Sequence, residues 1–184
     1  MKKAGSILLL FCFLMVFESK SQNPYTKNGS VSFFSKAVLE NIEASSGQVI
    51  SVINTTTGDI MFSVNIKSFH FKKSLMEEHF NENYMESDKY PKASFKGKIN
   101  NLSAISFSTD GSYNTEVTGD LTIHGITNKV TVPGKIVIKA GVPTAIATFR
   151  VKLADYKISI PRVVKDNIAE VVEVNLSCVY NHKL

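Results

Sequence analysis

Apolar and polar residues alternate with a period of two over most of this chain, and this pattern limits the fold more than any other feature. In "DIMFSVNIK", which begins at residue 59, Ile60, Phe62, Val64 and Ile66 are separated by mostly polar residues. The pattern recurs in "KASFKGKI" (92–99), "EVTGDLTIHG" (116–125) and "AIATFRVKL" (145–153). Successive side chains of a strand point to opposite faces of its sheet. These segments therefore predict antiparallel strands with one buried face.

Short polar segments rich in Gly, Asn, Asp and Thr separate the alternating segments. They are "NTTTGD" (54–59), "TDGS" (109–112), "HGITN" (124–128) and "KAGVPT" (139–144). Such residues favour turns, and they divide the chain into about eight or nine strands. We predict an all-β fold, either a closed antiparallel barrel or a sandwich.

One segment departs from the strand pattern. In "SLMEEHFNENYMES", residues 74–87, Met76, Phe80 and Tyr84 recur every four residues, which is helical spacing. Ser74 followed by Glu77 has the form of a capping box. Pro91 disfavours a helix beyond this point. We predict one short helix near 74–87, inserted between strands and covering an end or a side of the barrel.

The first residues have the features of a secretory signal. Two lysines precede an apolar run over residues 7–17, and Ser19 and Ser21 occupy the small-residue positions before Gln22. The run is shorter than the roughly 20 residues that span a bilayer. Cys12 follows the bulky Phe11 inside the run, unlike the cysteine of a lipoprotein signal. We predict a cleaved signal peptide over 1–21 and a single domain over 22–184.

Charge and cysteine content exclude several classes of protein. The formal net charge of the whole chain is +5, and its lysines are scattered without a basic block. This distribution does not predict nucleic-acid binding, and it allows at most transient contact with a membrane surface. Cys178 is the one cysteine outside the predicted signal, so we expect no internal disulfide and a buried thiol on the last strand.

No motif of a known catalytic or metal centre is present. The four histidines, His70, His79, His124 and His182, lie far apart in the sequence, and no HExxH, CxxC or G-x-S-x-G pattern occurs. A metal site assembled from distant positions stays open at this point. We predict a protein that is not an enzyme and that has no cofactor and no metal.

The inward positions of the predicted strands are apolar, and several hold phenylalanine. An eight-stranded barrel is either filled by side chains or holds one small ligand, and the period of the pattern allows both. Small residues at Ala93, Gly97, Gly119, Ala145 and Ala147 leave space if nothing larger faces them.

Several segments, in this order, resemble the YceI-like family of exported lipid-binding proteins. They are "KYPKASF", "GDLTIHGIT" over Gly119–Thr127, and a later segment matched by Phe149, Val151, Asp155, Tyr156 and Ile158. The resemblance implies a lipocalin-like barrel with a long hydrophobic cavity. It also implies binding or transport of polyisoprenoids, isoprenoid quinones or fatty-acid-type amphiphiles in the bacterial periplasm, with an extracellular location as the alternative.

On this interpretation, inward and lid residues form the wall of a lipid site. The predicted ligand-binding residues are Phe62, Val64, Ile66, Phe80, Tyr84, Phe95, Leu121, Ile123 and Phe149. Lys72, Lys73 and Arg162 are candidates for contact with an anionic head group. The alternative function is an exported structural or interaction domain with a filled core and no ligand. The sequence leaves the head group and the oligomeric state open.

His124 belongs to a predicted hairpin in "TGDLTIHGITNKVTV", residues 118–132. The alternation places Leu121 and Ile123 inward and His124 outward at the bend with Gly125. We predict a turn histidine that forms local hydrogen bonds, with a rim contact to ligand as the alternative.

Overall fold

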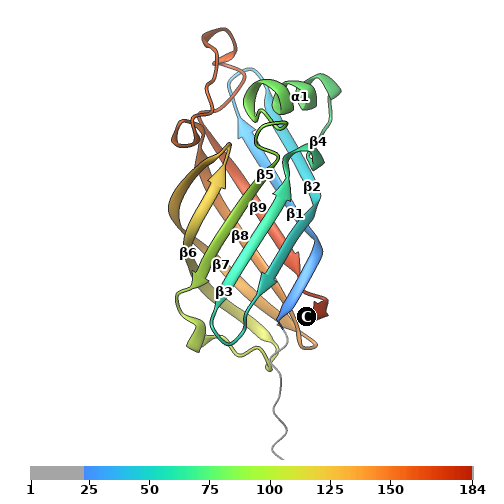
Figure 1. Cartoon of the computed structure of the whole chain (residues 1–184), viewed down its shortest axis with the longest axis vertical. Coiled ribbons are helices and arrows are strands. Elements are labelled where there is room, and N and C mark those ends of the chain that lie inside the picture. Colours follow the sequence, from blue (N-terminus) through green and yellow to red (C-terminus); the bar gives the residue numbers. More distant parts are fainter. Residues whose placement is uncertain (1–22, 184) are drawn as a thin grey trace, which may run out of the picture.

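The alternating segments form a ring of antiparallel strands (Figure 1). The computed structural model describes residues 23–183, so the predicted signal peptide over 1–21 lies outside the described residues. The ring order is β1-β9-β8-β7-β6-β5-β3-β2, and pairing of β1 with β2 closes it. The predicted antiparallel barrel of about eight strands is therefore confirmed.

The strands and helical turns follow one another along the chain. They are β1 (Pro24–Lys36), β2 (Asn41–Ile53), β3 (Asp59–Asn65), η1 (Ile66–Ser68), β4 (His70–Phe71), α1 (Ser74–His79), η2 (Phe80–Tyr84), β5 (Lys92–Ile99), η3 (Leu102–Ala104), β6 (Gly111–Ile123), β7 (Ile126–Lys139), β8 (Val142–Lys152), η4 (Leu153–Tyr156), η5 (Arg162–Val164), β9 (Val171–Val179) and β10 (His182–Lys183). The two-residue strands β4 and β10 extend the sheet beside β2 and β1.

The β6–β7 hairpin has a two-residue connection, in keeping with its sequence. Its register is unbroken to Ile123↔Ile126, which leaves His124 and Gly125 as a two-residue turn. Both residues have positive φ, 50° and 72°, as a type I′ turn requires. The bend predicted at His124 and Gly125 is confirmed.

Inward side chains fill the end of the barrel that lies away from α1. There Ile53, Ile99, Ile138, Cys178 and Tyr180 are all buried. They come from the ends of β2, β5, β7 and β9 and from the residue that follows β9. The opposite end, beneath α1 at the top of Figure 1, is packed differently and contains the site described below.

The predicted helix is present but its start differs from the prediction. Ser74 is the first helical residue and Lys73 is the N-cap, which makes no side-chain capping bond. The capping box is therefore wrong. The Glu77 carboxylate instead accepts the backbone N–H of Phe71 at 3.2 Å, across the turn that precedes the helix. α1 continues into η2, a π-helical turn, so the helical segment ends at Tyr84.

Candidate functional site

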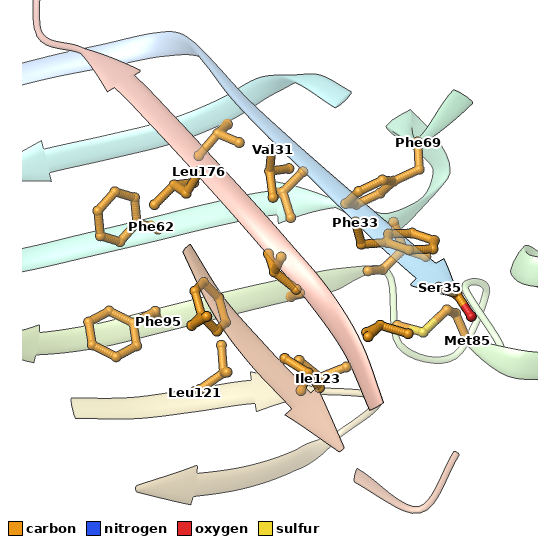
Figure 2. Close-up of a pocket in the computed structure, with 18 of the residues that line it drawn as sticks. Val31, Phe33, Ser35, Phe62, Phe69, Met85, Phe95, Leu121, Ile123 and Leu176 are labelled. Carbon is orange, nitrogen blue, oxygen red and sulfur yellow. The ribbon is translucent and has the colours of Figure 1, made fainter. Parts of the chain in front are cut away.

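A cavity of about 550 Å3 occupies the half of the barrel nearer α1. Figure 2 shows its wall, with Phe62, Phe95 and Leu121 on neighbouring strands and Phe33 and Phe69 toward the α1 end. Pockets for small ligands typically enclose about 300–1,000 Å3. The interior is therefore not filled, in contrast to the filled core of the alternative prediction.

The structure brings all nine predicted ligand-binding residues into the wall of this one cavity. Strands β3, β5, β6 and β8 and the turns η1 and η2 supply them: Phe62, Val64, Ile66, Phe80, Tyr84, Phe95, Leu121, Ile123 and Phe149. The shared position follows from the pleat, because side chains at alternate positions of a closed barrel point to its interior. That these residues contact a ligand remains a proposal.

Phe80 is the anchor of the helical lid. Its ring lies 5.5 Å from that of Phe33, 5.7 Å from Phe69 and 5.1 Å from Phe71. Such ring distances are typical of favourable aromatic pairs. Phe69 and Phe71 also line the cavity but were missed from the sequence. Their spacing of two in "SFHF" was the sequence feature that could have placed both rings on one inward face.

Two buried polar residues, Ser35 and Thr115, line the cavity, and both form hydrogen bonds within the protein. Ser35 is buried, and its hydroxyl accepts the backbone N–H of Ala169 at 2.9 Å. Thr115 donates to the side-chain oxygen of Asn101 at 2.5 Å. A wall of this kind favours apolar chains and has little capacity to bind polar ones.

Ion pairs connect the lid to the β1–β2 hairpin. Lys73 at the start of α1 pairs with Glu40, and both residues line the cavity mouth. Lys72 lies 3.7 Å from Glu43. Two of the three cations predicted to meet an anionic head group are thus paired with acids, whereas Arg162 has no ion pair among the described residues.

Three of the five small residues at inward positions line the cavity. Ala93, Ala145 and Ala147 line it, as the sequence predicted. Gly97 and Gly119 do not. They face each other across β5 and β6, where the Phe95 ring covers Gly97 and the backbone of Lys96 approaches Gly119 closely. These two glycines therefore leave no space, because larger groups already face them.

His124 forms long-range hydrogen bonds, and the prediction of local ones is wrong. Its Nε2 atom lies 2.7 Å from Oε2 of Glu86, and its Nδ1 atom lies 3.1 Å from the carbonyl oxygen of Tyr156. The Tyr90 ring packs edge-on against it at 4.7 Å. His124 does not line the cavity, and its contacts instead connect segments of the protein.

Burial controls the ionisation of groups in and below the site. Desolvation raises the pKa of the Cys178 thiol to about 12. It also raises the pKa of Tyr180, whose hydroxyl lies 2.7 Å from that of Ser51. The Tyr84 pKa at the cavity wall is raised for the same reason. Each shift keeps a neutral group inside the barrel.

Two further structural findings concern residues 23–183. Within this range no group of three or more His, Cys, Asp or Glu side chains is arranged to hold a metal ion. No helix of the same residues has the length and apolar character needed to cross a membrane.

These features define a lipocalin-like closed barrel with a lidded apolar cavity. The family profile of the YceI-like domain matches residues 23–180, and the chain belongs to this family. The family predicted from the sequence is therefore confirmed. A search of curated proteins found no match.

Solved structures share this fold at low sequence identity. Burkholderia cenocepacia BcnA is 20% identical with a TM-score of 0.68, over 82% of this chain and 95% of its own. A polyisoprenoid-binding domain from Saccharophagus degradans is 13% identical with a TM-score of 0.72, over 86% and 97%. The Campylobacter jejuni YceI protein is 15% identical with a TM-score of 0.53, over 79% and 86%.

Proposed function

We propose that this protein is a non-enzymatic carrier that binds, sequesters or transports a long-chain amphiphile in its barrel. The observation that supports this most is the apolar cavity of about 550 Å3 beneath α1. A polyisoprenoid, an isoprenoid quinone or a fatty-acid-type lipid fits its chemistry. The name of the Saccharophagus degradans domain specifies polyisoprenoid binding, which adds support for a polyisoprenoid ligand.

Transfer of the apolar chain from water drives binding in this proposal. Each buried methylene contributes about 0.8 kcal/mol, so affinity rises with chain length until the cavity is full. The nine wall residues named above contact the chain without directional bonds, and specificity along it is therefore loose. Polar groups outside the cavity fix the head.

The predicted signal peptide over 1–21 supports a place in the bacterial periplasm for this carrier. Exposed apolar side chains at the α1 end support transient contact with a membrane surface. Val38 and Leu39 lie in the β1–β2 turn, Leu75 on α1 and Val163 in η5. The Leu39 N–H donates to the Asp166 carbonyl at 3.0 Å, which links the turn to the segment after η5.

Extraction of the protein purified from its native host tests the carrier proposal. Organic solvent followed by mass spectrometry should recover one amphiphile in near-stoichiometric amount. The matched control is the Leu121→Glu variant, which places a charge in the cavity wall and should recover much less. Recovery of no amphiphile from the wild-type protein contradicts the proposal.

A further inference from the structure

The barrel wall has a gap between β7 and β8. The ladder of these strands runs from Lys139↔Val142 to Gly134↔Ala147 and stops there. β7 begins eight residues before Gly134, at Ile126, and β8 continues to Lys152, but these parts do not pair with each other. Pro133 is the first β7 residue beyond the ladder. It has no N–H to donate, and proline favours the edge of a sheet.

Hydrogen bonds close the gap again at the α1 end. The Asn128 side chain donates to the Asp155 carbonyl at 2.8 Å, and His124 lies 3.1 Å from the Tyr156 carbonyl oxygen. An opening therefore remains between these bonds and the end of the ladder. We name it the β7–β8 window, with edges formed by residues 128–133 and 148–152.

Only one layer of side chains separates this window from the interior cavity. A groove of about 1030 Å3 lies over the window on the outer side. Leu121, Val132, Phe149 and Val151 line both the groove and the cavity. Rotation of side chains is far faster than local unfolding of a strand. The layer can thus open without the loss of any ladder hydrogen bond.

The groove also carries three cations that form no ion pair within the described part of the chain, although acids lie opposite two of them. Glu173 faces Arg150 across β8 and β9, and Asp120 faces Lys129 across β6 and β7. Lys129, Arg150 and Lys152 line it, and none forms an ion pair among residues 23–183. Asp155 and Glu173 are the acids of the same groove. At the α1 mouth, by contrast, the corresponding lysines already pair with Glu40 and Glu43.

We propose that the β7–β8 window is a lateral portal for an amphiphile with an anionic head, a carboxylate or a phosphate. The inference rests on the proposed carrier function. The apolar chain passes the layer formed by Leu121 and Phe149 into the cavity. The head stays in the groove near Lys129, Arg150 and Lys152, where charge-assisted hydrogen bonds hold it.

Fluorescence quenching locates the head, because the chain contains no tryptophan. Thr131→Trp places a fluorophore in the groove and Leu75→Trp places one at the α1 mouth; both positions are exposed. Stearate with a nitroxide at carbon 5 should quench the first variant at least about twofold more than the second, since polar groups fix the orientation of a bound ligand. Stronger quenching of Leu75→Trp overturns the portal but leaves the carrier function standing.

Charge reversal tests the role of the cations. In the window variant, Lys129, Arg150 and Lys152 are each replaced by Glu. In the control variant, Glu replaces three exposed lysines of β5, namely Lys92, Lys96 and Lys98. The first variant should weaken palmitate binding by about tenfold or more and leave 1-hexadecanol binding unchanged, because charged pairs discriminate between heads. The control should leave both unchanged.

Equal weakening of palmitate binding by both triple variants overturns the portal, since general electrostatics would then explain the effect. If neither palmitate nor 1-hexadecanol binds the wild-type protein, the portal is overturned, and so is the fatty-acid-type ligand of the carrier proposal. Binding of both amphiphiles with no change in the window variant overturns the portal alone.

Discussion

The Nε2 atom of His124 lies 2.7 Å from Oε2 of Glu86, which joins the β6–β7 turn to the segment after the lid. Its Nδ1 atom lies 3.1 Å from the Tyr156 carbonyl oxygen. A carbonyl oxygen only accepts hydrogen bonds, so Nδ1 is the donor to Tyr156. Because the side chain is only 11% exposed, this one residue ties three segments together.

Replacement of His124 by Ala should therefore lower the free energy of unfolding by roughly 1–3 kcal/mol, since it leaves partly buried partners without a donor. Glu86→Gln should lower it less, because the side-chain amide can still form a hydrogen bond with Nε2. Urea denaturation followed by circular dichroism measures both changes.

The control for this pair is the exposed ion pair of Lys67 and Asp88. Their side chains are 57% and 93% exposed, and surface pairs contribute about 0–1 kcal/mol. Lys67→Ala should have little effect on unfolding. An equal loss of stability in Lys67→Ala and His124→Ala would refute the structural role of His124.

Gly125 should not tolerate a side chain. Its φ is +72°, and a Cβ added there would lie 2.5 Å from the Tyr90 ring. The left-handed backbone alone costs a non-glycine residue roughly 1–2 kcal/mol. Gly125→Ala should lower the urea midpoint clearly.

Gly47→Ala is the matched control, because nothing lies within 4 Å of its added Cβ and no positive φ is involved. It should leave the urea midpoint unchanged or slightly raised, as alanine restricts the unfolded chain. A neutral Gly125→Ala variant would show that the turn relaxes and that the Tyr90 contact is not a constraint.

The sequence predicted the strands of the barrel because a period of two is a local property. Phe62 and Phe95 both face the interior because each lies at an apolar position of an alternating strand. The partners of His124 are 38 and 32 residues away, and no local pattern encodes such distances. The lack of space at Gly97 was likewise not predictable, because it depends on the Phe95 ring that lies over this residue.

The β7–β8 window was also beyond sequence reasoning. The alternation runs through β7 without a break, so it predicts a strand but not which of its edges is paired. Pro133 was the one residue that indicated an unpaired strand edge in β7. It is equally compatible with pairing to β6, where it lies opposite Glu116.

Filling the cavity should weaken binding without unfolding the protein. Ala147 lines the cavity on β8, and Ala147→Leu reduces the free volume. The longest fatty acid that binds tightly should become shorter by a few methylenes, each of which contributes about 0.8 kcal/mol. Titration of a chain-length series by calorimetry measures this.

Ala104→Leu is the control, because Ala104 is exposed in η3 and lies outside the cavity. Its chain-length profile should match that of the wild-type protein. An unchanged profile in Ala147→Leu would place the bound chain elsewhere and contradict the cavity as the site.

Cys178 should be chemically inert in the folded protein. It is 0% exposed, and burial raises its pKa from 9.0 to about 12. The thiolate is the reactive form of cysteine, so iodoacetamide at pH 8 should label it only after urea unfolds the barrel. Rapid labelling under native conditions would show that this end of the barrel opens.

The same shift predicts a loss of stability in alkali. A group whose folded pKa is raised stabilises the protein fully below its unfolded pKa, and this contribution is lost as the pH rises through the folded pKa. For Cys178 the loss therefore begins near pH 9.0 and continues toward about pH 12. Cys178→Ala should show a shallower fall in the free energy of unfolding over this range. Part of the fall should remain, because burial raises the Tyr180 pKa in the same direction. Identical slopes in both proteins would mean that the thiol is not desolvated.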